Sequence, residues 1–178
     1  YKDHKSDTIY TSFKVKKSNI KELKESEIII WTTTPWTIPA NKALAYNRSL
    51  KYLVIKIEDA IDFKGRQIVI AETLLNSVLE ECQIKKYSKI CEFIGKDFEE
   101  TVCSHPLSKI GFSYDIPMLE ANFVTTEQGT GIVHCAPSHG PDDFNLCLNN
   151  GIKAIETVDG DGKYTDSIPE FKGMHIFK

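Results

Sequence analysis

Three adjacent hydroxyl side chains occur in the stretch WTTTPWTIPAN, residues 31–41: Thr32, Thr33 and Thr34. They end an apolar run at Pro35, which stops a strand, so the last hydroxyls are expected at the mouth of a cleft. Asn41 follows with an amide that both donates and accepts hydrogen bonds. Together these groups suit the binding of a polar substrate or a water molecule. Threonine is also a good strand residue, and a purely structural role stays open.

A second cluster of chemically active side chains lies in GTGIVHCAPSHGPDDF, residues 129–144. It contains two imidazoles and two carboxylates: His134, His139, Asp142 and Asp143. An imidazole titrates near neutral pH and serves as an acid or a base, and a carboxylate binds a cation. The structural alternatives are a hydrogen-bonded core histidine and aspartates that cap a helix. One aspartate can cap the helix while the other points into a cleft.

Metal and thiol chemistry are disfavoured at this second cluster. A zinc site of His134, Cys135 and His139 is unsuitable, because neighbouring strand residues face opposite ways. The same opposition argues against Cys135 as a nucleophile activated by His134. The segment DGDGKYTDSIPE, residues 159–170, resembles a calcium loop but has a tyrosine at the sixth position, where glycine is needed. We therefore predict no metal ligands and a hairpin turn at 159–163.

Short β segments must position these residues. Alternating or β-branched runs predict strands at 9–15, 27–34, 51–58, 67–71, 122–126 and 132–135. If the second of these strands runs to Thr34, then Thr32 and Thr34 share one face and Thr33 takes the other. The glycines of 128–131 predict a tight turn.

Helices are expected in two places. Apolar spacing predicts a helix over 72–82, and Pro141 with the two following aspartates predicts a helix start, with an end at 149–151. Strands and helices do not alternate regularly along the chain. We therefore predict a mainly β, α+β fold with a closed or distorted β-barrel core and peripheral helices.

Length and composition fit a single domain over 1–178. A net charge of −3 excludes a globally basic surface for nucleic acid, and a local RNA contact through scattered lysines stays open: Lys85, Lys86, Lys89 and Lys96. Five cysteines without a CxxC pair indicate a reducing compartment, and no apolar run is long enough to span a bilayer. Because the chain begins with Tyr1, we expect part of a larger enzyme. We also expect a monomer located in the cytoplasm.

The two clusters together resemble the editing domain inserted into class I aminoacyl-tRNA synthetases for branched aliphatic amino acids. WTTTPWTIPAN is similar to that family's threonine-rich motif, and GTGIVHCAPSHGPDDF to its second motif. Within the family the match is to the isoleucine branch, since the valine enzymes typically have a lysine where this chain has His134. The resemblance extends from about Thr8 to Phe177. The HIGH and KMSKS signatures of the synthetic site are absent from the sequence.

The resemblance implies hydrolysis of the aminoacyl ester of misacylated Val-tRNA(Ile), with no cofactor in this domain. It implies catalytic roles for Thr33, Thr34 and Asp143. It also implies a substrate-binding set: Thr32, Asn41, His134 and Asp143. Asp143 would bind the α-ammonium, and His134 would either wall the amino-acid pocket or act as a base. The implied partners are the 3′-aminoacylated end of tRNA(Ile) and the remainder of the synthetase.

Three alternatives remain at this stage. The first is a non-catalytic module that binds the tRNA 3′ end. The second is the editing domain of a valine or leucine relative, and the third is an unrelated zinc or cysteine hydrolase. The tryptophans Trp31 and Trp36 are expected to pack in the protein rather than to stack on bases.

Overall fold

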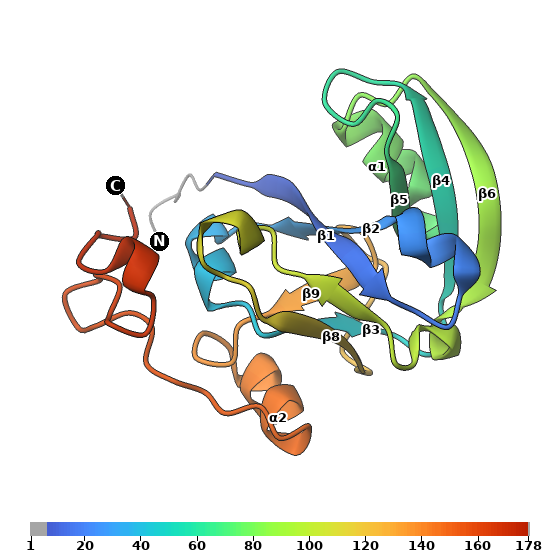
Figure 1. The fold of residues 1–178 in the computed structure, drawn as a ribbon. Helices are drawn as coiled ribbons and strands as arrows, with labels where there is room; N and C mark the ends of the chain where they lie inside the picture. Colours follow the sequence, from blue (N-terminus) through green and yellow to red (C-terminus); the bar gives the residue numbers. More distant parts are fainter. Residues whose placement is uncertain (1–6, 178) are drawn as a thin grey trace.

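Nine strands form one curved mixed sheet in the computed structural model, which describes residues 7–177 (Figure 1). Residues 1–6 and 178 of the predicted domain lie outside the described part. The strands are β1 (Ile9–Lys17), β2 (Glu27–Thr32), β3 (Ala43–Tyr46), β4 (Lys51–Asp59), β5 (Gln67–Ala71), β6 (Lys86–Ile94), β7 (Val102–Ser104), β8 (Asp115–Glu120) and β9 (Ile132–Cys135). Their order in the sheet is β6-β4-β5-β2-β1-β7-β8-β3-β9.

The sheet curls but does not close. β2 pairs in parallel with β5 and β3 with β8, and the other neighbours are antiparallel. β9 ends the order yet runs beside β2. The Thr130 hydroxyl donates to Ile29 O at 2.6 Å, and Ala71 N–H donates to Thr130 O at 2.8 Å. The mainly β prediction is confirmed, but the sheet is not closed into a barrel, since its terminal strands β6 and β9 pair only with β4 and β3 within the described residues.

Two apolar layers explain the continuous apolar run of β2. Ile28 and Ile30 face the inside of the curl with Phe13 and Tyr52, whereas Ile29 faces the other side of the sheet. Successive strand residues point to opposite faces, so a strand buried on both sides shows no alternation. Each such isoleucine contributes about 1.5–3 kcal/mol of transfer free energy when fully buried.

The helices pack at two separate places (Figure 1). α1 (Leu75–Glu81) follows a 3-10 turn and buries Val78 against the outer face of β4 and β5. α2 (Pro141–Asn149) buries Cys147 against Ala43 and Ala45 of β3. Both predicted helices are confirmed. No helix within 7–177 is long and apolar enough to cross a membrane.

Some strand predictions were wrong. The strand expected over 27–34 ends at Thr32, and the strand expected over 122–126 is a series of turns. The chain leaves the sheet there because Ala121 N–H bonds to Tyr46 O, and Val124 O accepts a hydrogen bond from the Asn47 side chain at 3.0 Å. β3 and β8 were not expected. The turn at 159–163 is confirmed by the 2.9 Å bond from Asp159 N–H to Lys163 O.

Candidate functional site

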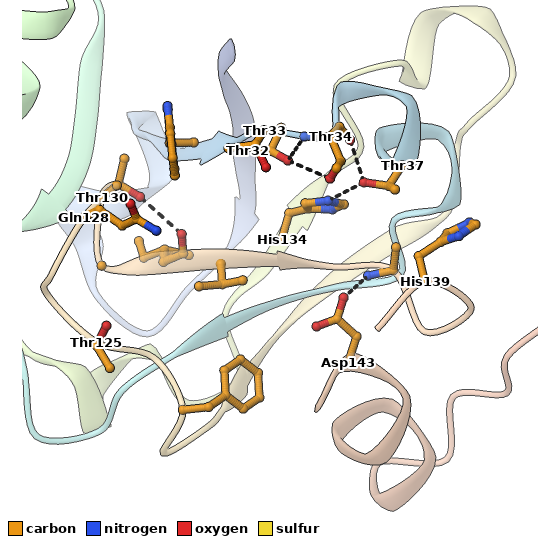
Figure 2. Close-up of a pocket in the computed structure, with 17 residues that line it drawn as sticks. Thr32, Thr33, Thr34, Thr37, Thr125, Gln128, Thr130, His134, His139 and Asp143 are labelled. Atoms are coloured by element: carbon orange, nitrogen blue, oxygen red, sulfur yellow. Dashed lines mark hydrogen bonds between the residues drawn. The ribbon is translucent and has the colours of Figure 1, made fainter. Parts of the chain in front are cut away.

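A cavity of about 330 Å³ opens where the end of β2, the strand β9 and the start of α2 meet (Figure 2). Of the residues that the sequence indicated, Thr32, Thr33, Thr34, His134 and Asp143 all line it. The segment before β9 contributes six further lining residues and the start of β9 two: Phe123, Thr125, Gln128, Gly129, Thr130 and Gly131, then Ile132 and Val133. Trp31, Thr37, Ala136 and His139 complete the lining.

The threonine run bends instead of continuing as a strand. The Thr32 hydroxyl accepts the Thr34 backbone N–H at 3.1 Å, and a 3-10 helix, η2 (Pro35–Ala40), starts immediately afterwards. This local bond replaces a hydrogen bond to a neighbouring strand, and Pro35 prevents the strand from continuing. As a result Thr33 does not turn away, as alternation predicted, and all three side chains line the cavity. Thr33 and Thr34 are exposed, and Thr32 is buried.

His134 stands on β9, opposite Leu44 of β3, with its ring held on both sides. Nε2 lies 2.9 Å from Thr37 Oγ1, and Nδ1 lies 3.1 Å from Asn41 Nδ2. The residue is only 9% exposed. Burial, with smaller contributions from His105 and His139, lowers the pKa of His134 to about 4. The ring is therefore neutral at physiological pH.

Asp143 lies in the first turn of α2, beside the cavity. Its Oδ2 accepts the Ala136 backbone N–H at 2.9 Å, and Figure 2 shows the second carboxylate oxygen pointing away from that bond. Burial raises the pKa of Asp143, while the bond from Ala136 opposes the shift. Asp142, the next residue back, is exposed and does not line the cavity. Among the lining residues only Asp143 carries a carboxylate, so it is the natural contact for a ligand cation.

Asn41 is not at the cavity wall. It is 0% exposed and lies behind His134, with its amide nitrogen directed at that ring and at Ala43 O, 3.0 Å away. The expectation that Asn41 contacts substrate directly does not match this position. The strand ends at Thr32 and η2 then carries Asn41 back under the wall, which a spacing of nine residues could not reveal.

The rim of the cavity is braced by the C-terminal segment. His139 Nε2 lies 2.6 Å from Thr157 Oγ1, and its ring meets Trp36 edge to face with centroids 5.0 Å apart. Tyr164 OH donates to Trp36 O at 2.6 Å. Trp31 and Trp36 are both partly buried, and Trp31 lies on the cavity wall.

Sequence reasoning missed several lining residues. Thr37 follows Thr34 by three positions, and its hydroxyl donates to Thr34 O at 2.8 Å, a spacing typical of a 3-10 turn. Phe123 and Thr125 belong to the turns that were taken for a strand, and Gln128 belongs to the tight turn predicted over 128–131. A spacing argument can find Thr37, whereas the other three reach the cavity only through tertiary structure.

The structure also bears on the metal and thiol alternatives. Cys135 is 0% exposed and packs with Ala43, Ala45 and Cys147, on the face of β9 opposite His134. Burial raises the pKa of its thiol well above the ordinary value, so the reactive thiolate is suppressed. Within the part of the chain described, no three His, Cys, Asp or Glu side chains are grouped to hold a metal.

Stability is expected to fall as the pH drops from about 6.5 toward 4. Burial lowers the pKa of both His105 and His134 to about 4, so between these values the unfolded chain takes up protons that the folded chain refuses. Each histidine then contributes about 3 kcal/mol that is present above pH 6.5 and lost on acidification. Urea unfolding at several pH values measures the slope.

The variant His105→Gln should flatten that slope, since it removes one of the two groups. Asp143 acts in the opposite direction, because its raised pKa gives stability that is lost as the pH rises. An unfolding free energy that does not change between pH 7 and pH 4.5 would contradict the neutral, buried state of the two histidines.

Comparison with known proteins agrees with the family resemblance of the two sequence motifs. A family model described as the editing domain of leucyl-tRNA synthetase matches residues 5–174. The chain is 71% identical over 178 residues to isoleucine–tRNA ligase of Pelagibacter ubique (strain HTCC1062) and 41% identical over 184 residues to that of Gluconobacter oxydans (strain 621H). The whole chain is covered in both cases, but it spans only 20% and 19% of those relatives.

Solved structures share the fold. The editing domain of P. knowlesi cytosolic leucyl-tRNA synthetase superposes with a TM-score of 0.61 at 16% identity, covering 82% of this chain and 62% of that one. The P. falciparum counterpart gives 0.57 at 19% identity, covering 72% and 47%. At these identities the likeness concerns the fold alone.

Proposed function

The chain belongs to the leucyl-tRNA synthetase editing-domain family, and on that premise we propose that it hydrolyses the aminoacyl ester of misacylated Val-tRNA(Ile). The substrate would be the 3′-aminoacylated end of tRNA(Ile), delivered by the remainder of a synthetase. The domain would act as a monomer in the cytoplasm and without a cofactor. The observation that carries the proposal is the meeting of three threonine hydroxyls and the Asp143 carboxylate on one cavity.

Asp143 suits the α-ammonium of the substrate. An aminoacyl ester keeps a free ammonium next to the reacting carbonyl, and a partly buried carboxylate binds such a group by a charge-assisted hydrogen bond. Oδ2 already accepts the Ala136 N–H, which fixes the carboxylate and leaves Oδ1 for the substrate. The ammonium would in turn favour the ionised carboxylate against the effect of burial.

The threonines suit the reacting ester. Such an ester is labile, so positioning a water molecule and stabilising the developing oxyanion are sufficient for catalysis. Thr33 is exposed on the cavity, and its hydroxyl makes no hydrogen bond to another side chain or backbone group in residues 7–177. Thr34 bonds only loosely, at 3.3 Å, to the Thr32 hydroxyl. Both hydroxyls are therefore free to bind the ester, the terminal ribose or the water.

His134 suits the wall of the amino-acid pocket. One methylene in a hydrophobic pocket is worth only ~1–3 kcal/mol, a limit for which the isoleucine enzymes are the standard example, so a second and smaller site must remove the valyl product. His134 is neutral and fixed by two hydrogen bonds, which makes it a rigid obstacle to a larger side chain.

Replacing His134 by alanine is expected to let isoleucine enter. Hydrolysis of Ile-tRNA(Ile) should rise relative to Val-tRNA(Ile) by roughly tenfold or more, because the size limit is lost. Parallel deacylation assays with both esters measure the ratio. An unchanged ratio together with a large loss of both rates would instead assign His134 to the chemistry itself.

The test of the function is deacylation of Val-tRNA(Ile) and Ile-tRNA(Ile) by this chain at high concentration. Hydrolysis that prefers the valyl ester supports the proposal. Tight binding of a valyl-adenosine mimic without turnover would favour the non-catalytic module. A rate abolished by thiol alkylation or by a chelator would favour a cysteine or zinc hydrolase.

A further inference from the structure

Asn41 uses both of its amide hydrogens inside the protein. Nδ2 donates to Ala43 O at 3.0 Å and lies 3.1 Å from His134 Nδ1. A backbone carbonyl can only accept, so the amide nitrogen, and not the amide oxygen, must face Ala43. The second hydrogen of that nitrogen then points to His134 Nδ1, which must offer a lone pair.

The other side of the ring gives the same answer independently. Thr37 Oγ1 lies 2.8 Å from Thr34 O and 2.9 Å from His134 Nε2. A hydroxyl has one hydrogen, and the Thr34 carbonyl can only accept it. Thr37 therefore donates to Thr34 and accepts from a protonated Nε2 of His134. The hydrogen bonds run in one direction, from Asn41 through His134 and Thr37 to Thr34 O.

We infer that Asn41 is a positioning residue that holds His134 as the neutral Nε2–H tautomer, so that the ring presents carbon rather than nitrogen to the cavity. The only lone pair of the neutral ring is covered by Asn41, which is itself fully buried. His134 then has no nitrogen free to take a proton from water. It serves as an apolar wall for an aliphatic side chain, and Asn41 indirectly sets the specificity.

The arrangement also keeps the wall uncharged. Protonation would put Nδ1–H against an amide hydrogen of Asn41. Asn41 could offer its oxygen to Nδ1–H only by turning the amide over, and that turn would break the hydrogen bond from Nδ2 to Ala43 O. His105 and His139 add to this cost, and Asp143 lines the same cavity. A cationic wall would compete with the substrate ammonium for Asp143.

One feature indicates that this orientation is retained at a cost to stability. Asn41 Oδ1 is the one buried side-chain nitrogen or oxygen without a hydrogen-bond partner in residues 7–177. An unsatisfied buried amide oxygen is unfavourable for folding. Such local violations of good packing concentrate at functional sites. The Asn41 oxygen therefore has no hydrogen bond, while both hydrogens of its amide nitrogen are bonded, one to Ala43 O and one to His134 Nδ1.

The tautomer can be read directly from two-bond proton–nitrogen correlation spectra of the ¹⁵N-labelled chain at neutral pH. We expect a neutral His134 with its proton on Nε2. His105 is an internal reference, since its Nδ1 accepts Leu107 N–H at 3.0 Å and its Nε2 lies 3.0 Å from Ile38 O, which fixes the same tautomer without Asn41. A proton on His134 Nδ1 at neutral pH, in either the other tautomer or the imidazolium, would overturn the inference.

The variant Asn41→Asp tests the causal role of the amide. A carboxylate only accepts, so it should draw a proton onto Nδ1 while Nε2–H stays on Thr37, and His134 should become an imidazolium at neutral pH. The matched control is Asn47→Asp, because Asn47 also donates to a carbonyl, Val124 O, but has no hydrogen bond to a histidine within residues 7–177. An unshifted His134 in Asn41→Asp would refute the role. If this variant does not fold, the wild-type spectrum still decides.

An activity measurement rests on the proposed function. With a charged wall, Asn41→Asp should lose about tenfold or more in kcat/KM for Val-tRNA(Ile), mainly through KM, whereas Asn47→Asp should not. Unchanged kcat/KM in a variant whose His134 is charged would overturn the specificity role of Asn41. If no form of the chain hydrolyses the ester while the tautomer is as inferred, the proposed function fails and the positioning role stands.

Discussion

Replacing Asp143 by alanine is expected to lower the deacylation of Val-tRNA(Ile) by about 100-fold or more, with the fold intact. Asp143 supplies the single carboxylate among the residues that line the cavity. Its removal leaves the substrate ammonium without a partner in a partly dry site, and breaking such a pair costs a few kcal/mol. The lost bond to Ala136 N–H should cost only about 1 kcal/mol of folding stability.

The control for this variant is its neighbour. Asp142 lies in the same first turn of α2 but is exposed and outside the cavity. Asp142→Ala therefore removes an equal charge from the helix N-terminus without touching the site. Asp143→Asn keeps the side-chain shape and removes the charge, so it should behave like Asp143→Ala. Equal activity of the Asp142 and Asp143 variants would show that the carboxylate in the cavity is not used.

Replacing Gly131 by alanine is expected to destabilise the chain by several kcal/mol. Its φ of +77° is a conformation that other residues adopt at a cost of ~1–2 kcal/mol. A Cβ placed there would lie 2.3 Å from Ala71 Cβ, so β5 or the turn before β9 must shift, which adds about 1–3 kcal/mol. The Gly131 carbonyl also accepts the Tyr52 hydroxyl at 2.8 Å, and a shift would disturb that buried bond.

Gly151→Ala is the matched control for the steric part. Gly151 has a φ of +75°, but a Cβ there meets nothing within 4 Å. Urea unfolding of both variants separates the backbone cost, which they share, from the overlap, which only Gly131→Ala has. Equal losses would mean that β5 accommodates the methyl group freely. A Gly131→Ala variant that folds should also deacylate poorly, because Gly131 lines the cavity.

Periodicity and turn residues were enough to locate much of the fold. β4, β5, β9 and both helices follow patterns that act within a few residues, such as strand alternation and glycine turns. β3 is four residues long and buried throughout, so it has no alternation to detect. β8 contains Pro117, which argues against a central strand, yet it pairs with both β7 and β3. Partners distant in sequence determine these two strands.

The candidate site was predictable to a similar extent. The motifs indicated Thr32, Thr33, Thr34, His134 and Asp143, and the structure brings these five to one cavity. Asn41 was assigned to the substrate-binding set because it belongs to the same motif, but η2 places it behind His134, away from the cavity. A sequence motif records which residues go together and does not distinguish a residue that touches the ligand from one that supports it.

The cavity joins two segments of the chain that are far apart in sequence and are therefore synthesised at different times. Thr37 and His134 are in hydrogen-bond contact across 97 residues, and the brace on His139 comes later still, from Thr157. Closing a loop of this length costs conformational entropy before the contact stabilises the chain, so contacts of such large sequence separation slow folding. During synthesis on the ribosome, Thr32 to Thr37 therefore lack these partners until β9 and the C-terminal segment have been made. In refolding, we expect the sheet signal to recover before the deacylation that we propose for this domain.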